Sequence, residues 1–199
     1  MGDPRALQWV GDSLQVLGRR TDGVFLATRV DPATGAPEAT FGEGGPLTLP
    51  DVFSRASVFL ATTTHVVFGG YEVLAADDWA WRIQSRTVDG AVAWDEMDDL
   101  TNPTTFEAGL DQVTGLALYG DQLLALGIAD GSRDQIDGQL RDPATGAVTS
   151  EWTNLAPSVQ AVTAVDGAAL YFGGSYEVRL GAGGRGWAIE RVAAPGGGG

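Results

Sequence analysis

The sequence Arg141-Asp142-Pro143-Ala144-Thr145-Gly146-Ala147-Val148 occurs in nearly the same form earlier in the chain, as Val30-Asp31-Pro32-Ala33-Thr34-Gly35-Ala36-Pro37. A shortened version is Val88-Asp89-Gly90-Ala91-Val92. Proline fixes φ early in a tight turn, and glycine supplies the positive φ that closes it. Each copy follows a strand-like run and precedes another, so we expect a hairpin turn at a fixed point of a repeating unit.

Four further segments share one spacing, in which a turn precedes an apolar strand and a glycine ends that strand. Their first residues are 52, 57 and 47 positions apart along the chain. A period of this length suits a unit of four short strands. The segments are Gly11–Gly18, Thr63–Gly70, Gly120–Gly127 and Gly167–Gly174.

Each segment lies between two other strand-like runs, and the tight turn then leads to a fourth run that ends on Phe41, Trp94 or Trp152. Consecutive strands joined by tight turns form an antiparallel meander, and meanders around an axis form a β-propeller. We therefore predict an all-β, β-propeller-like fold with four blades of about four antiparallel strands each. The predicted repeats are residues 6–46, 52–101, 107–155 and 157–193 of a single domain, 1–193.

The fourth unit lacks a candidate for its outer strand, because a Gly-rich tail that we treat as a linker, residues 194–199, follows it. An uncovered sheet edge is a liability. We therefore expect this chain to be part of a larger propeller or to complete its edge with another chain. A helix over residues 106–126 is rejected, because Gly109, Gly115 and Gly120 would each cost about 1 kcal/mol relative to alanine.

The chain is strongly acidic, with a formal net charge of −14 and a pI of about 4.2. Nucleic acid and anionic lipid surfaces would be repelled, so we exclude both as partners. The absence of cysteine excludes disulfides and thiolate metal sites. No apolar run is long enough for a bilayer, and no charged and then apolar segment opens the chain as a signal peptide would. All basic residues are arginine, which indicates a GC-rich coding bias or an extracellular composition. We expect an extracellular or cell-envelope location.

The order of turns and strands resembles bacterial β-propeller repeats of the delta-60 and quinoprotein-like kinds. The residues that show the resemblance are Asp31 to Gly35, Asp142 to Gly146, Leu170 to Gly174 and Trp152. The resemblance implies a propeller and an interaction module of secreted or envelope proteins. Quinoprotein enzymes add cofactor and metal residues around the axis, and we find no counterpart of these here, so we expect no cofactor.

Two short patterns suggest catalysis but are better explained by structure. Gly11-Asp12-Ser13-Leu14 spells the signature of GDSL esterases, which also need a histidine base. The only histidine is His65, and no Asp-x-x-His sequence occurs. We interpret Gly11-Asp12 as a recurring turn and His65 as a strand residue, since a lone histidine cannot build a multi-histidine metal site.

A weak calcium candidate lies in residues 130–138, where Asp130, Asp134 and Asp137 place oxygen ligands at intervals. An EF-hand loop requires other residues at its third and twelfth positions, and Arg133 adds a positive charge, so we favour a polar turn. The run Asp95–Asp99 is denser in carboxylates, and we interpret it as a solvated loop.

Long, dissimilar loops are expected on one face of the propeller, between second and third strands and between blades. The charges of these loops sum to −11 of the total −14. Loops that vary over a repeated scaffold are the usual place for function. Trp79 and Trp81 lie two apart and share a face, where they either pack between blades or form a sugar-stacking platform. The candidate binding residues are Asp77, Asp78, Asp130, Asp134, Trp79 and Trp81.

We predict a non-enzymatic binding or scaffold module that acts through its acidic loop face or open blade edge, as a component of an extracellular or envelope assembly. Its partner would be a protein or a second copy of the chain, with carbohydrate as a further candidate. The alternative is a carbohydrate-active hydrolase or lyase, in which paired carboxylates about 5–10 Å apart near the axis do acid/base work. An inward-facing pair of carboxylates would favour the enzyme.

Overall fold

The computed structural model describes residues 3–42, 45–49, 55–76, 78–98, 111–128, 135–157, 163–166, 169–178 and 184–193. All regular structure within these ranges is β-strand. The strands form three four-stranded sheets and one three-stranded sheet, named A to D in chain order. Each sheet is a meander in which strands adjacent in the chain pair antiparallel.

The strand bounds are as follows. Sheet A consists of β1 (Asp3–Val10), β2 (Ser13–Arg19), β3 (Phe25–Val30) and β4 (Leu47–Thr48). Sheet B consists of β5 (Arg55–Ala61), β6 (His65–Ala75), β7 (Asp78–Thr87) and β8 (Val92–Asp98). Sheet C consists of β9 (Gln112–Tyr119), β10 (Gln122–Ile128), β11 (Gln135–Arg141) and β12 (Val148–Pro157). Sheet D consists of β13 (Thr163–Asp166), β14 (Ala169–Val178) and β15 (Gly184–Ala193).

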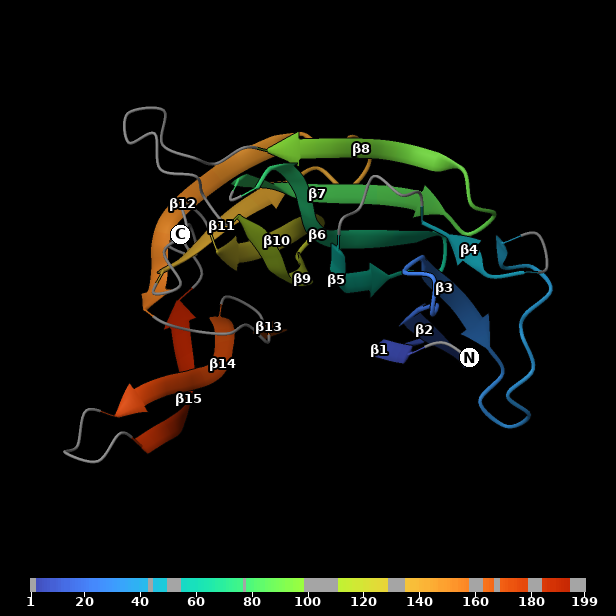
Figure 1. Ribbon diagram of the computed structural model, residues 1–199, viewed down its shortest axis with the longest axis horizontal. Helices are drawn as coiled ribbons and strands as arrows, with labels where there is room; N and C mark the ends of the chain where they lie inside the picture. Colours follow the sequence, from blue (N-terminus) through green and yellow to red (C-terminus); the bar gives the residue numbers. More distant parts are fainter. Residues whose placement is uncertain are drawn as a thin grey trace.

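The four sheets are arranged in an arc, with sheets A and D at its two ends (Figure 1). The first strand of each sheet contacts the first strand of the next, through β1 with β5, β5 with β9 and β9 with β13. The side chain of Gln8 continues this contact by hydrogen bonding both backbone groups of Ala61, at 3.0 and 2.8 Å. First strands that meet in this way line a common axis. The all-β, propeller-like prediction is therefore confirmed at this level.

The repeated turns have the predicted chemistry in both long copies. Asp31 and Asp142 each accept a backbone hydrogen bond from the glycine four residues on, at 2.7 and 2.8 Å. The side chain of each aspartate also caps the turn, by accepting from the backbone N–H of Ala33 or Ala144 at 2.7 Å. The N–H groups of Thr34 and Ala33 lower the pKa of Asp31, because both hydrogen bonds favour the ionised carboxylate.

The predicted fourth strands are displaced from their expected places. In sheet A the turn is followed only by an isolated bridge between Val30 and Pro37, and β4 begins six residues after Phe41. In sheet B, β8 continues past Trp94 to Asp98. The strands β9 and β10 confirm the rejection of a helix for residues 112–126, while residues 101–110 lie outside the described part.

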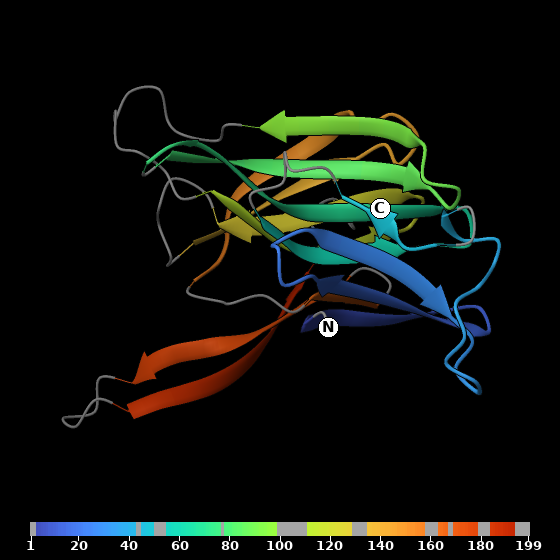
Figure 2. The ribbon, with the colours of Figure 1, turned by 45° about the vertical axis from the view of Figure 1, so that its right-hand side comes forward.

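The apolar core lies between successive sheets. One cluster joins Leu17, Phe25 and Ala27 of sheet A to Val66 and Phe68 of sheet B. A second cluster joins the opposite face of sheet B to sheet C, and consists of Val67, Trp81, Ile83, Trp94, Val113, Leu123 and Ala125. Sheet B is thus buried on both faces. Figure 2 shows β14 and β15, in orange and red, projecting from one end of the molecule.

The turn of sheet C is also a contact with sheet B. The indole Nε1 of Trp94 donates a hydrogen bond to the carbonyl of Pro143 at 2.9 Å. Gly146 has a φ of +79°, and a Cβ at this position would lie 2.6 Å from the Trp94 ring. Glycine is therefore required at Gly146 both by backbone conformation and by the close approach of the indole.

Within the described residues, no helix has the length and apolarity to cross a membrane.

We predict that Gly146→Ala destabilises the protein more than Gly35→Ala. Both glycines have positive φ, which costs a residue with a Cβ about 1 kcal/mol. A Cβ at Gly35 has nothing within 4 Å, whereas one at Gly146 meets Trp94. We expect Gly146→Ala to cost about 1–3 kcal/mol more than Gly35→Ala in urea unfolding, because the indole must move. Equal losses of stability for the two variants would show that the close contact between Gly146 and Trp94 does not contribute to stability.

Candidate functional site

The sequence-predicted binding residues lie where the second and third strands of each sheet connect, which we call the loop end. Asp78 and Trp79 begin β7 and are half-buried, and Trp81 is fully buried. The predicted loop over 71–78 is largely strand, because β6 continues to Ala75. Asp77, Asp130 and Asp134 lie outside the described residues.

The two tryptophans have different surroundings although they share a face of β7. The ring of Trp79 stacks on Tyr71 with centroids 4.1 Å apart and planes 4° apart. Trp81 is in the core between sheets B and C, and its Nε1 donates to the carbonyl of Ile128 at 2.7 Å. Trp81 therefore packs between sheets, and its ring is not available to stack on a sugar.

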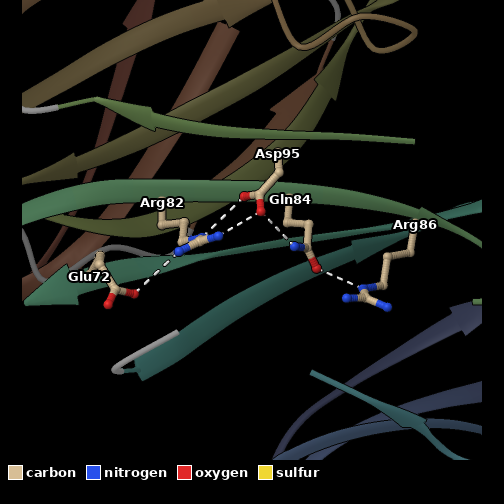
Figure 3. A network of polar contacts seen from close by, with 5 residues as sticks. All are labelled: Glu72, Arg82, Gln84, Arg86 and Asp95. Atoms are coloured by element: carbon tan, nitrogen blue, oxygen red, sulfur yellow. Dashed lines mark hydrogen bonds and ion pairs between the residues drawn. The ribbon is translucent and has the colours of Figure 1, made fainter. Parts of the chain in front are cut away.

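The acidic run that begins at Asp95 is a strand and not the solvated loop that we predicted. Side chains alternate along β8. Asp95 therefore lies on the face of sheet B that meets sheet A, and Glu96 and Asp98 lie on the face that meets sheet C. Asp95 forms a bidentate pair with Arg82, at 3.1 and 2.6 Å, and accepts from Gln84 at 2.9 Å (Figure 3). Several of the charges counted for the predicted acidic loop face are therefore paired within sheet B.

The same network continues along the face of β7 in both directions. The guanidinium of Arg82 also lies 3.5 Å from Glu72 on β6. Arg86 donates to Gln84 at 2.7 Å and to the carbonyl of Gly90 at 3.0 Å. Burial lowers the pKa of Arg86, an effect that the charge of Asp95 opposes. Every cation of this row is held by oxygen acceptors, so the network serves structure.

Arg141 is the most deeply buried cation of the described chain. Its guanidinium pairs with Asp98 of β8 and donates to Gln139 and to the carbonyl of Gly146, the last at 2.7 Å. Burial lowers the pKa of Arg141, while the charges of Glu96 and Glu151 raise it. This side chain joins sheets B and C through an ion pair.

A separate polar cluster lies on the axis-lining strands at the loop end. Asp111, directly before β9, is fully buried. Its neighbour Gln112 donates from Nε2 to the hydroxyl of Ser57 on β5 at 3.1 Å, and Ser57 donates to the carbonyl of Val113 at 2.9 Å. Sequence reasoning missed Asp111 because it placed this residue at the end of a long loop. The available signal was its position directly before the alternating run Gln112–Tyr119.

A second carboxylate lies on the same face of sheet C. Val113 pairs with Gly127 on β10, and Gly127 pairs with Asp137 on β11, so Val113 and Asp137 share a face. Asp111 precedes Val113 by two residues and belongs to this face by alternation. Two strand spacings separate Val113 from Asp137, a backbone distance of about 10 Å. Asp137 is half-buried.

The remaining sequence candidates lie elsewhere. Ser13 donates to Glu38, and His65 lies beside Thr64 at 3.0 Å, so no histidine contacts Ser13 in the described structure. Within the same residues, no group of three or more His, Cys, Asp or Glu could hold a metal ion. Of the weak calcium candidate only Asp137 is described.

The fold resembles that of a known class of proteins, the β-propellers. No family model and no curated protein matches the chain. Among solved structures, a putative 6-phosphogluconolactonase from Bacteroides fragilis matches 92% of this chain at a TM-score of 0.51 and 16% sequence identity. The chain spans about half, 54%, of the length of that structure. At this identity the likeness shows a β-propeller-like fold.

This comparison corrects our functional prediction. We expected a non-enzymatic scaffold that acts through an acidic loop face or an open blade edge, and that prediction was wrong. The structure that the chain resembles is that of a putative enzyme. In addition, the predicted acidic loop face has fewer unpaired charges than we counted, because Asp95 pairs with Arg82 and Asp98 pairs with Arg141.

We predict that Arg141→Met lowers the free energy of unfolding by about 3 kcal/mol, because it leaves Asp98 and Gln139 without their cation. Arg5→Met is the matched control, since Arg5 pairs with Asp3 at the surface. We expect this control to change stability by less than about 0.5 kcal/mol in guanidinium unfolding. A similar small loss for Arg141→Met would contradict a structural role for the buried pair.

Proposed function

We propose that the protein is a hydrolase that acts on a sugar-derived substrate at the loop end of the axis. The observation that supports this proposal is the placement of Asp111 and Asp137 on one face of sheet C, beside the axis-lining strands. Asp111 is two strand spacings across and two residues along the sheet from Asp137, a backbone distance of about 12 Å. The proposal requires the two side chains to bring their carboxyl groups within about 5–10 Å of each other, which leaves room for a water molecule between them.

In this proposal Asp111 acts as the general base. Its burial holds the carboxylate out of bulk water, directly before the strand whose first residue, Gln112, hydrogen bonds Ser57 of sheet B. The carboxylate removes a proton from a water molecule as the water oxygen attacks the carbonyl carbon of an ester or lactone. The bond from that carbon to the leaving oxygen then breaks, and Asp137 supplies the proton that this oxygen takes up.

The substrate class follows from two considerations. The Bacteroides structure is that of a putative 6-phosphogluconolactonase, so a cyclic ester of a sugar acid is the first substrate to test. The half-buried pair of Tyr71 and Trp79 adds flat aromatic surface at the same end of the sheets. Aromatic rings of this kind provide contact area for the apolar faces of a sugar ring.

The finer architecture is also part of the proposal. We propose that sheets A to D are four successive blades, that the fourth lacks its outer strand, and that they form part of a larger or multi-chain propeller. The contacts between successive first strands support the blade arrangement. The coverage of about half of the Bacteroides structure supports a ring with further blades.

We predict that Asp111→Asn lowers kcat/KM for a sugar lactone by about 100-fold or more, because the amide cannot accept the proton of water. The rate is measured as proton release above the spontaneous background, first with gluconolactone and then with its 6-phosphate. Asp137→Asn should lower kcat with a change in the pH profile, since Asp137 delivers a proton.

Asp121→Asn provides the matched control, because Asp121 is exposed in the hairpin turn between β9 and β10, at the opposite end of the sheet. This variant should retain full activity. Circular dichroism and thermal unfolding establish that each variant is folded. A wild-type rate equal to background, or equal activity of the Asp111 and Asp121 variants, would contradict the proposal.

A further inference from the structure

The strand registers define which face of each sheet meets the preceding sheet. The pairs Leu14–Val30, Val66–Arg86 and Leu123–Arg141 occupy the same position, directly before the repeated turn, in sheets A, B and C. Val66 packs against sheet A and Leu123 against sheet B. We call the face that contains these pairs the leading face of each sheet. The other face, which meets the following sheet, is the trailing face.

The leading face of sheet A is apolar, and no sheet of the described residues packs against it. Leu7 and Trp9 are each 63% exposed, whereas the residues at the same register positions in sheet B, Phe59 and Ala61, are 9% and 6% exposed. By alternation and pairing, this face consists chiefly of Leu7, Trp9, Leu14, Val16, Leu26 and Val30. Contiguous exposed apolar side chains of this kind mark an interaction surface.

At two register positions, the leading faces of sheets B and C have long polar side chains, and sheet A has smaller ones. Sheets B and C have a glutamine and an arginine there, Gln84 with Arg86 and Gln139 with Arg141. Sheet A has Thr28 and Val30 at these two positions. The leading face of sheet A therefore lacks the arginine that is half-buried in sheet B and fully buried in sheet C, and suits an apolar contact.

The repeated turn provides an independent observation. In sheets B and C, a side chain of the preceding sheet occupies the space beside the turn glycine, Leu47 beside Gly90 and Trp94 beside Gly146. The equivalent position in sheet A, Gly35, has nothing within 4 Å of where a Cβ would lie. Among the described residues, no preceding sheet contacts sheet A at the turn or along the strands.

We propose that the leading face of sheet A binds the trailing face of sheet D in a second copy of this chain. The backbone register of sheet D repeats that of sheet B, with Tyr171, Ile189 and Trp187 at the positions of Val67, Ile83 and Trp81. In sheet B those positions form the trailing face that covers sheet C. Sheet D thus has aromatic or apolar residue types at three of the register positions that a leading face contacts, and Arg191, paired with Tyr171, takes the position of Ser85.

A second copy also accounts for the geometry of the arc. Sheets A and D lie at opposite ends of the arc (Figure 1), and the chain matches 54% of a propeller-like structure. Two such arcs related by a two-fold axis form one closed ring with two identical contacts between sheets A and D. Closed symmetry of this kind leaves neither apolar face exposed.

The test is the molar mass of the wild-type chain by size-exclusion chromatography with light scattering. We expect twice the chain mass of 20.7 kDa. The double substitution Leu7→Glu and Trp9→Glu should raise the dissociation constant by about 100-fold, because it places two charges in an apolar contact. Both side chains are exposed in the single chain, so the unfolding transition of the dissociated variant should be retained.

Val92→Glu and Met97→Glu form the matched control, because these side chains are 51% and 52% exposed and lie on the outermost strand of sheet B. These variants should keep the doubled mass. Since the sequence has no cysteine, mixing a Trp9→Cys chain with an Ile189→Cys chain and adding a bifunctional thiol reagent tests the identity of the partner face. A mixed cross-link is expected.

Three outcomes would overturn the proposal. The first is a wild-type chain that remains a single copy at all concentrations. The second is a double variant that keeps the doubled mass. The third is cross-linking only between two Trp9→Cys chains, which would show that sheet A pairs with itself. A series of masses rising with concentration would likewise overturn the closed pair.

Discussion

The structure depends on the burial of both faces of thin antiparallel sheets. A single meander of short strands cannot bury enough apolar surface to be stable alone, so each sheet relies on its neighbours. Sheet B shows the complete case, with Phe68 directed to sheet A and Val67 to sheet C. This need for a neighbour on each side explains the repeating sequence, the contact between first strands and the importance of the uncovered face of sheet A.

Polar side chains are accommodated within this stacking because each has several partners. Arg141 has a carboxylate, a side-chain amide and a backbone carbonyl around its guanidinium. Removing charged groups from water is costly unless they are paired and hydrogen-bonded. Asp111 is fully buried at the loop end of an axis-lining strand. Its position links the packing of the sheets to the proposed chemistry.

Much of the architecture was predictable because turn chemistry is local. The D-P-A-T-G sequences specify their own hydrogen bonds, and the glycine interruptions between residues 112 and 126 exclude a helix without reference to the rest of the chain. The position of Asp95 and Asp98 in a strand, and their ion pairs, were not predictable in this way. Their acidic run is suited to solvent, but its backbone pairs with β7, and its carboxylates find Arg82 on the neighbouring strand and Arg141 on the neighbouring sheet. Asp111 was missed for the same reason, since burial is a property of the assembled sheets.

The contact between Trp94 and the turn at Pro143 shows how the boundaries between successive sheets are filled. This indole lies toward the outer rim, between two sheets whose inner strands already touch. It therefore fills the space between sheets B and C at the repeated turn. Leu47 fills the equivalent space between sheets A and B with a smaller side chain. Each boundary between these sheets is thus filled at the turn by one side chain of the preceding sheet, an isobutyl group in one case and an indole in the other.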